Sequence, residues 1–222
     1  MRLLIINGSP RGTRSNSLVI ANHFLRGIKA SLQNNLQLGV LNLIEGHAVL
    51  SDATEKIAVA DKVLFAFPLY VDSMPGLVME LFESLYNLKG KLSGKEFLFS
   101  IQCGFPETLN LRFVERYLQK LAGRLGADYV GCISRGGMEG ARFLSEDSEV
   151  LQRYRELGEI FGKTGKLDKD LLGKIAHPER IPLAAKAIAL ALSPAGIFNE
   201  YWNRQLKANG VYKRRNDRPY EE

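Results

Sequence analysis

"RLLIINGSPRGTRSNS", residues 2–17, contains the turn that decides the fold. It opens with a continuous apolar run, which is typical of a strand buried on both faces of a parallel sheet. The run stops at Asn7, and Gly8 and Gly12 permit positive φ in the turn that follows. The apolar spacing of 17–32 then predicts a helix. A strand, a loop and a helix therefore follow one another directly.

The loop at 8–17 is rich in groups that bind anions. Hydroxyl or amide side chains come from Ser9, Thr13, Ser15, Asn16 and Ser17, and positive charge comes from Arg11 and Arg14. The N–H groups and dipole of the following helix point back into the loop, which favours a phosphate. The loop lacks the Gly-Lys-Ser/Thr ending of a triphosphate loop and the GxGxxG dinucleotide fingerprint. A terminal monophosphate fits best, and a capped turn without a ligand is the alternative.

The chain up to about residue 145 alternates predicted strands and helices. Apolar runs predict further strands at 36–43, 63–70, 95–103 and 128–137, and helical patterns predict helices at 51–62, 74–88 and 107–126. Such alternation predicts an α/β fold with one parallel sheet covered by helices on both faces. Five strands with right-handed crossovers fit the doubly wound order 2-1-3-4-5. The loops after Asn7, Phe67 and Gln102 would then meet at the switch point, where such sheets bind ligands.

Beyond about residue 145 the alternation stops. Residues 148–165 and 181–192 read as helices, and the end of the chain is polar and basic. We therefore expect a sheet domain at 1–145 and a mainly helical extension at 146–222, packed on that domain or on a dimer partner. The segment 183–192 is apolar nearly all round, which predicts burial within its own chain or in a dimer contact.

Composition narrows the classes of function. The chain has 222 residues, a net charge of +6 and two cysteines without a CxxC, so a disulfide framework, an iron–sulfur cluster and a zinc site are not expected. We expect no metal site and no integral membrane segment, because prolines interrupt the apolar stretch 181–198. Without a signal-peptide pattern, the expected location is cytoplasmic. The short basic run 213–218 favours a solvated arm over a nucleic-acid surface.

Four motifs resemble the NADPH-dependent FMN reductase family, a group of flavodoxin-like NAD(P)H oxidoreductases. "GSPRGTRSNS" (8–17) resembles the family's phosphate loop, and "FPLYVDSMPGLVMELFE" (67–83) resembles its second loop. "CGFPE" (103–107) stands where the family has its third flavin loop, and "SRGGMEG" (134–140) stands where it has a further glycine-rich loop. The resemblance covers roughly residues 1–145 and implies a flavodoxin-like sheet. A departure is Met79, where family members usually carry a lysine.

The resemblance also implies which residues bind the cofactor. Those that would hold the FMN phosphate are Ser9, Arg11, Ser15, Asn16 and Ser17. Those that would run beside the isoalloxazine ring are Pro68, Leu69, Tyr70 and Val71, and those that would border it are Cys103, Gly104 and Phe105. Tyr70 and Phe105 are otherwise ordinary core or rim aromatics. No residue is assigned a catalytic role, because Cys103 is expected to be a packing thiol.

The implied function is an FMN-dependent oxidoreductase that takes a hydride from NADPH or NADH. It would pass the electrons to a small acceptor, which is a quinone, an azo or nitro compound, or free flavin. Apolar residues on more than one face of the helix at 75–88 predict self-association, and the resemblance implies a homodimer or higher homo-oligomer formed through this region. Two alternatives stay open, a flavodoxin-like electron carrier and a flavin-free binding or assembly module with the same fold. The basic charge speaks against the carrier, since flavodoxins are acidic.

Overall fold

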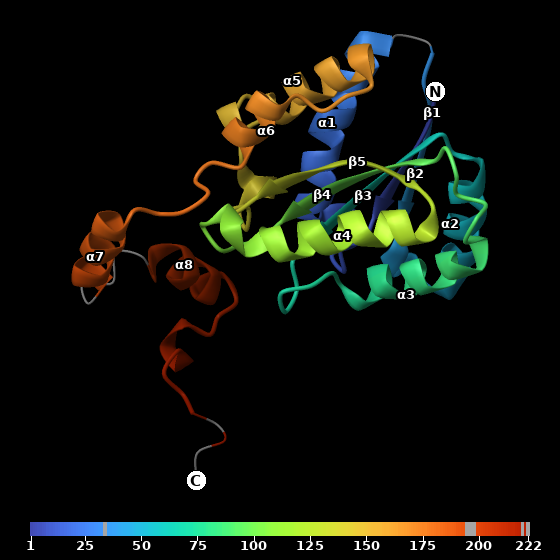
Figure 1. Cartoon of the computed structure of the whole chain (residues 1–222). Coiled ribbons are helices and arrows are strands. Elements are labelled where there is room, and N and C mark those ends of the chain that lie inside the picture. The colour runs from blue at the N-terminus through green and yellow to red at the C-terminus, as the bar shows by residue number, and fades with distance from the viewer. Residues whose placement is uncertain (33–34, 194–198, 219, 221–222) are drawn as a thin grey trace. The chain divides into compact units, whose positions relative to one another are not determined.

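The computed structural model describes residues 1–32, 35–193, 199–218 and 220. The chain divides into two compact units, Met1–Arg180 and Ile181–Glu222, which are described separately (Figure 1).

Unit 1 (Met1–Arg180) is built on one sheet of five strands. The strands are β1 (Arg2–Asn7), β2 (Gln37–Asn42), β3 (Lys62–Pro68), β4 (Glu96–Gln102) and β5 (Asp128–Arg135). All neighbours pair in parallel, and the order is β2-β1-β3-β4-β5. The α/β doubly wound prediction and its strand order are confirmed. The carboxyl ends of all five strands therefore face the same edge of the sheet.

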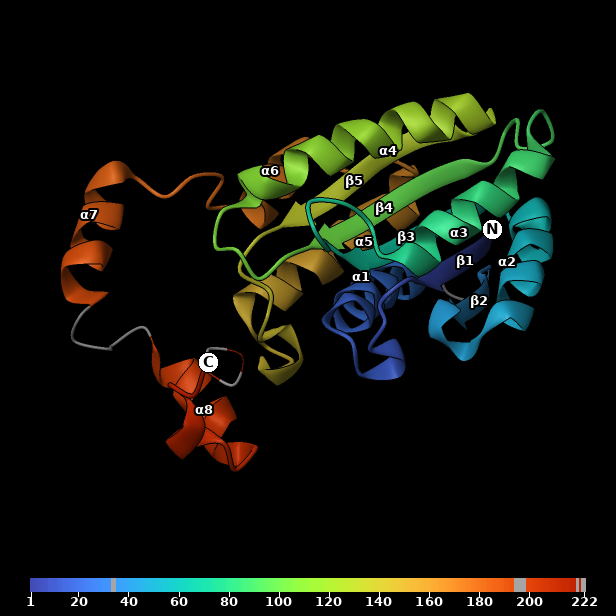
Figure 2. The same cartoon turned by 90° about the horizontal axis from the view of Figure 1, so that it is seen from below.

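Helices cover both faces of this sheet (Figures 1 and 2). One face carries α1 (Asn16–Leu32), α5 (Glu149–Thr164) and α6 (Lys169–Ile175), and the other carries α2 (His47–Val59), α3 (Gly76–Leu85) and α4 (Arg112–Leu125). α2 begins at His47, earlier than the predicted start at 51, because the chain enters the helix from Gly46 rather than from a side-chain cap. The other predicted helices lie close to their expected places.

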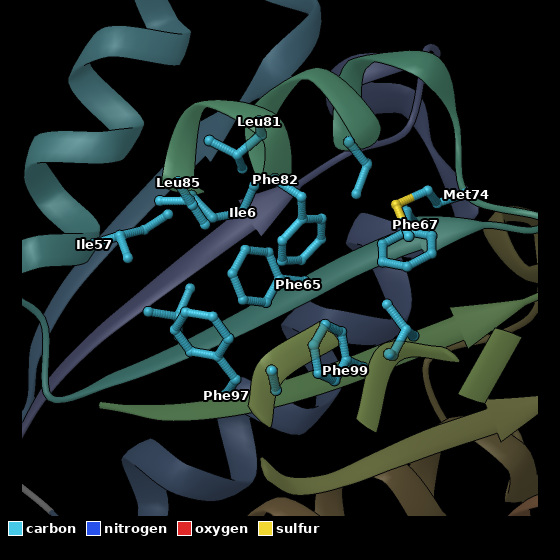
Figure 3. Packing of buried hydrophobic residues seen from close by; sticks show 14 of the residues in the cluster. Ile6, Ile57, Phe65, Phe67, Met74, Leu81, Phe82, Leu85, Phe97 and Phe99 are labelled. Atoms are coloured by element: carbon cyan, nitrogen blue, oxygen red, sulfur yellow. The ribbon is translucent and has the colours of Figure 1, made fainter. Parts of the chain in front are cut away.

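Buried aromatic rings fill the layer between the sheet and α2–α4 (Figure 3). Phe65 lies at its centre, with ring centroids 4.9 Å from Phe82, 5.0 Å from Phe97 and 5.3 Å from Phe99. Alternate residues of the same strands, such as Leu64, point to the face that α1 and α5 cover. Each fully buried side chain of this size contributes about 1.5–3 kcal/mol. Burial on both faces explains why β1, β3 and β4 read as continuous apolar runs.

Glycines let α5 pack directly against α1. A Cβ atom on Gly158 would lie 1.9 Å from the carbonyl oxygen of Phe24, and one on Gly27 would lie 1.9 Å from that of Arg155. The two helix backbones therefore touch, and α5 completes the cover of the sheet. For this reason the compact unit extends to Arg180, past the domain boundary expected at 145.

The segment after α6 is fastened to loops at the carboxyl edge of the sheet. Arg135, the last residue of β5, donates to the carbonyl oxygen of His177 at 2.8 Å. Arg112 pairs with Glu179 at 2.6 Å, and the Thr108 N–H donates to the carbonyl oxygen of Pro178 at 3.1 Å. These contacts hold the last residues of unit 1 beside the loops that follow β4 and β5.

Unit 2 (Ile181–Glu222) contains α7 (Leu183–Leu192) and α8 (Glu200–Ala208). Neither helix buries a residue. Burial of 183–192 within unit 2 is therefore not observed, and a dimer contact stays a prediction. The end of the apolar stretch, 194–198, lies outside the described residues. In the described ranges, no helix combines the length and the hydropathy needed to cross a membrane.

Candidate functional site

A pocket opens where the strand order reverses, at the carboxyl ends of β1, β3 and β4. Its lining comprises Ser9, Arg11, Asn16, Pro68, Leu69, Tyr70, Gln102, Cys103, Gly104 and Glu139. Polar side chains come from the loop after β1, and apolar or aromatic groups come from the loops after β3 and β4. The sheet thus brings three of the predicted loops together at the place where doubly wound folds bind ligands.

Asn7 organises the loop that follows β1. Its side chain is fully buried, and its amide nitrogen donates to the carbonyl oxygen of Gly12 at 2.8 Å and to Asn42 at 2.9 Å. Its amide oxygen accepts from the N–H of Ser9 and the hydroxyl of Ser15, each at 3.3 Å. All these bonds shape one turn, so Asn7 positions the loop without lining the pocket. The sequence signal was a polar residue closing an apolar strand.

Gly8 and Gly12 serve the loop in different ways. Gly12 has φ +54°, as expected. Gly8 does not have a positive φ, which corrects the sequence expectation. A Cβ atom on Gly8 would instead lie 2.1 Å from Val78 of α3, so this glycine is needed for space. The loop consequently leaves β1 in close contact with the first turns of α3.

The hydroxyl and amide groups of this loop divide into structural groups and pocket groups. The Ser15 hydroxyl accepts from the N–H of Leu18 at 3.1 Å and so caps α1. The Asn16 amide donates to the carbonyl oxygen of Glu139 at 2.7 Å and accepts from the N–H of Arg142 at 3.0 Å. Asn16 thereby ties the loop to the one after β5. Ser9 lines the pocket, where its hydroxyl accepts from the N–H of Arg11 at 3.3 Å.

The loop after β3 contains a strained turn. Tyr70 and Ser73 exchange backbone hydrogen bonds of 2.8 and 2.9 Å, and the two residues between them, Val71 and Asp72, have φ +47° and +56°. A β-branched residue at positive φ is costly, and such strain concentrates at functional sites. Val71 is 100% exposed and does not line the pocket, whereas Tyr70 does. The turn therefore places the half-exposed Tyr70 in the pocket lining.

The loop after β4 rests on the loop after β5. The backbone N–H of Cys103 donates to the carbonyl oxygen of Arg135 at 3.2 Å. The backbone N–H of Met138 donates in turn to the carbonyl oxygen of Cys103 at 2.9 Å. A Cβ atom on Gly136 would lie 2.7 Å from the carbonyl oxygen of Phe105. The Phe105 ring itself is exposed and outside the pocket lining. The glycine-rich "SRGG" stretch thus allows the two loops to approach closely.

Cys103 lies in the pocket as a protonated thiol. Its side chain is buried, and this burial raises the pKa of the thiol to about 11. At neutral pH the group is therefore almost entirely uncharged and weakly nucleophilic. Its thiol also donates to the carbonyl oxygen of Phe105 at 3.5 Å. These features agree with a packing role.

Two pocket residues, Gln102 and Glu139, were missed in the sequence analysis. Gln102 ends β4, and its buried amide lies 3.4 Å from the Ser17 hydroxyl. Glu139 follows the glycines after β5 and pairs with Arg11 at 3.2 Å. A polar residue closing an apolar strand was the signal available for Gln102. Glu139 lies within the motif "SRGGMEG" (134–140), which marked the loop without indicating that this carboxylate would reach the loop after β1.

The predicted site residues are thus brought to one edge of the sheet, but not all line the pocket. Those outside its lining are Ser15, Ser17, Val71 and Phe105. Ser15 and Ser17 are buried beneath the loop, whereas Val71 and Phe105 are exposed at its margin.

Comparison with known protein families identifies the family to which this fold belongs. A family model described as the flavodoxin-like fold matches residues 1–157. The chain belongs to the flavodoxin-like fold family. The match spans all five strands and confirms the flavodoxin-like family predicted from the loop motifs. A search of curated proteins gives no match.

Solved structures with this fold include several flavoprotein reductases. An FMN-dependent NADH-azoreductase from Bacillus anthracis, in complex with FMN, aligns with a TM-score of 0.57 and 18% identity over 72% of this chain and 97% of that one. An NADH:FMN oxidoreductase in its apo form aligns with a TM-score of 0.59 and 18% identity. The alignment covers 80% of this chain and 96% of that one. An NAD(P)H:quinone oxidoreductase from Methanothermobacter marburgensis aligns with a TM-score of 0.56 and 14% identity. The alignment covers 76% of this chain and 97% of that one. At such low sequence identities, these alignments show that the proteins share a fold.

Proposed function

We propose that the chain is an FMN-dependent NAD(P)H oxidoreductase that reduces a small acceptor such as a quinone, an azo or nitro compound, or free flavin. The observation that carries this proposal is the meeting of the loops after β1, β3 and β4 in one pocket at the switch point. One side of the pocket offers hydrogen-bond donors and a guanidinium group. The other side offers apolar and aromatic groups.

The residues present fit FMN. Ser9 and Arg11 supply a hydroxyl donor and a positive charge for the phosphate, beside the first turn of α1. Pro68, Leu69 and Tyr70 supply a surface for the ring, and the absence of a side chain at Gly104 leaves the backbone accessible. The pocket has a volume of about 60 Å³, room for one small part of FMN such as its phosphate group.

FMN, when bound, supplies a two-electron centre that accepts a hydride and passes electrons on. The protein's own groups bind FMN and orient it. Arg11 and Ser9 hold the anionic end, and the apolar loop after β3 limits the access of water to the ring. Hydride transfer to flavin needs no acid–base pair, which agrees with the protonated state of the Cys103 thiol. We therefore assign no catalytic side chain.

The solved structures support the proposal by analogy. Proteins of this fold that are described as an NADH-azoreductase, an NADH:FMN oxidoreductase and an NAD(P)H:quinone oxidoreductase align over nearly their whole lengths. We further propose that the protein acts in the cytoplasm as a homodimer.

Reconstitution and reduction test the proposed function. The purified protein should be yellow or take up FMN, and NADPH or NADH should bleach the bound flavin in a stopped-flow experiment. The double variant Asn16→Ala/Ser17→Ala should weaken FMN binding by more than about tenfold, because the loop loses both its tie to Glu139 and a hydroxyl group. Bound FMN that neither nucleotide bleaches would favour an electron carrier. A protein that ignores FMN would favour the flavin-free module.

A further inference from the structure

Unit 2 exposes an apolar helix, α7, which stays unburied among the residues that the structure describes. No residue of α7 is buried, and Leu183 and Leu190 are 83% and 76% exposed. Lys186 is its one charged residue. An exposed apolar surface of this kind marks a contact with a partner or a membrane. The helix has ten residues, so it is about 15 Å long, half of what a bilayer core requires.

The neighbouring helix, α8, is amphipathic. Trp202 and Leu206 are four residues apart and share one face, whereas Glu200, Arg204 and Lys207 lie on the other. The Trp202 side chain is 58% exposed, and its ring contacts that of Tyr201 at 5.1 Å. Adjacent tryptophan and tyrosine rings beside cationic side chains are typical of segments at the surface of a bilayer.

Charge distinguishes between the possible occupants of this surface. Residues 181–222 contain seven Lys and Arg against four Asp and Glu, a net charge of +3, and four of the basic residues fall within 213–218. If a second copy covered α7 with its own residues 181–222, it would bring a like charge of +3 to this segment. Anionic lipids offer the opposite charge, worth about 1 kcal/mol for each Lys or Arg near the surface. They also offer an apolar layer for α7, which a nucleic acid does not.

From these observations we propose that unit 2 docks the protein on the surface of a membrane containing anionic lipids. α7 enters the outer part of the apolar layer, and Trp202 lies at its boundary. The basic side chains of α8 and of 213–218 face the lipid headgroups. This proposal is independent of the flavin site, since every residue that carries it lies in unit 2.

Trp202 gives a direct test because it is the single tryptophan of the chain. The full-length protein is mixed with vesicles of phosphatidylglycerol and phosphatidylcholine, and separately with vesicles of phosphatidylcholine alone. We expect the fluorescence of Trp202 to move to shorter wavelength, and the protein to float with the vesicles, only when phosphatidylglycerol is present. Raising the salt from about 0.1 M to about 1 M should reverse most of the binding, because the Debye length falls from about 10 to about 3 Å. No shift, or an equal shift with both lipids, would overturn the proposal.

A pair of variants tests the role of α7. Ile188→Asp/Leu190→Asp should reduce vesicle affinity by more than about tenfold, since charged groups replace two apolar side chains. The matched control is Val59→Asp, an exposed residue at the end of α2, which should bind vesicles like the wild type. Far-UV circular dichroism checks that both variants are folded. If the α7 variant binds vesicles normally but halves the mass measured by light scattering, a second copy covers α7 and the proposal is wrong.

Discussion

Arg11 and Glu139, which lie 128 residues apart in the chain, form an ion pair inside the candidate site. The guanidinium belongs to the loop after β1, and the carboxylate comes from the loop after β5. The two charged groups are 3.2 Å apart, and both side chains line the pocket. Since Arg11 is also a proposed partner of the FMN phosphate, Glu139 competes with that phosphate for the same cation.

Replacement of this carboxylate should strengthen FMN binding. Glu139→Gln removes a negative charge beside an anion site, and an exposed pair of this kind is worth about 0.2–1 kcal/mol. We expect the Kd for FMN, measured by flavin fluorescence, to fall about two- to fivefold at low salt and less at high salt. Glu149→Gln, which removes an equal charge from α5, should leave the Kd unchanged. Weaker binding in Glu139→Gln would mean that Glu139 positions Arg11 and does not compete.

Two serines of the same loop should respond differently to substitution. Ser9→Ala should weaken FMN binding about tenfold, because a pocket hydroxyl group that we propose holds the phosphate is lost. It should lower stability less than Ser15→Ala does, because the only hydrogen bond of this hydroxyl within the described structure is a long one of 3.3 Å from the Arg11 N–H. Ser15→Ala should lower the free energy of unfolding by about 1 kcal/mol, because this hydroxyl caps α1. Isothermal titration and urea unfolding of both variants measure the two effects. Equal effects on both quantities would show that the hydroxyls are not divided in this way.

Cys103 should prove dispensable for flavin reduction. Its pKa of about 11 leaves almost no thiolate at neutral pH, so iodoacetamide should alkylate it slowly at pH 7 and faster as the pH rises toward 11. Cys103→Ala should retain a bleaching rate by NADPH or NADH within about threefold of the wild type. A loss of more than about a hundredfold with FMN still bound would assign the thiol a catalytic role.

Patterns in the sequence predict the sheet well and the pocket incompletely. The alternation of strands and helices, together with right-handed crossovers, predicts the strand order. The meeting of the loops after β1, β3 and β4 could therefore be predicted from the sequence. Glu139 could not be placed, because its position depends on how the loop after β5 folds over Asn16. The need for glycine at position 8 could not be predicted from the sequence either. The side chain of Val78, which belongs to α3, leaves no space for a Cβ atom there.

A second limit concerns the end of the sheet unit. The sequence pattern of 148–165 predicts a helix but not its partner, and a break in alternation at 145 was the visible signal. The contact that joins α5 to α1 depends on three glycines, Gly27, Gly158 and Gly162, whose joint role appears only when the helices are side by side. Gly158 and Gly162 stand four residues apart on α5, but this spacing does not say which helix packs against them.

The proposed homodimer should form through α3 and α4. An apolar groove of about 690 Å³ runs between them, and its lining includes Met79, Tyr86 and Tyr117. Apolar exposed patches of this kind are typical of contact surfaces. Light scattering at micromolar concentration should give twice the mass of one chain, and Tyr117→Glu should give the mass of a single chain. Phe143→Glu, at an exposed ring outside the groove, is the control. A monomeric wild type would refute the dimer.

The contact between α1 and α5 should depend on the missing side chain at Gly158. An added methyl group would lie 1.9 Å from the Phe24 carbonyl oxygen, so Gly158→Ala must force the helix backbones apart. We expect a loss of at least about 2 kcal/mol in the free energy of unfolding, measured in urea by far-UV circular dichroism. Gly123→Ala in α4 is the matched control, because no atom lies within 4 Å of its new methyl group, and its higher helix propensity should raise stability by up to about 1 kcal/mol. If both variants were equally stable, the backbones of α1 and α5 would not be in contact, and α5 would not be an integral part of unit 1.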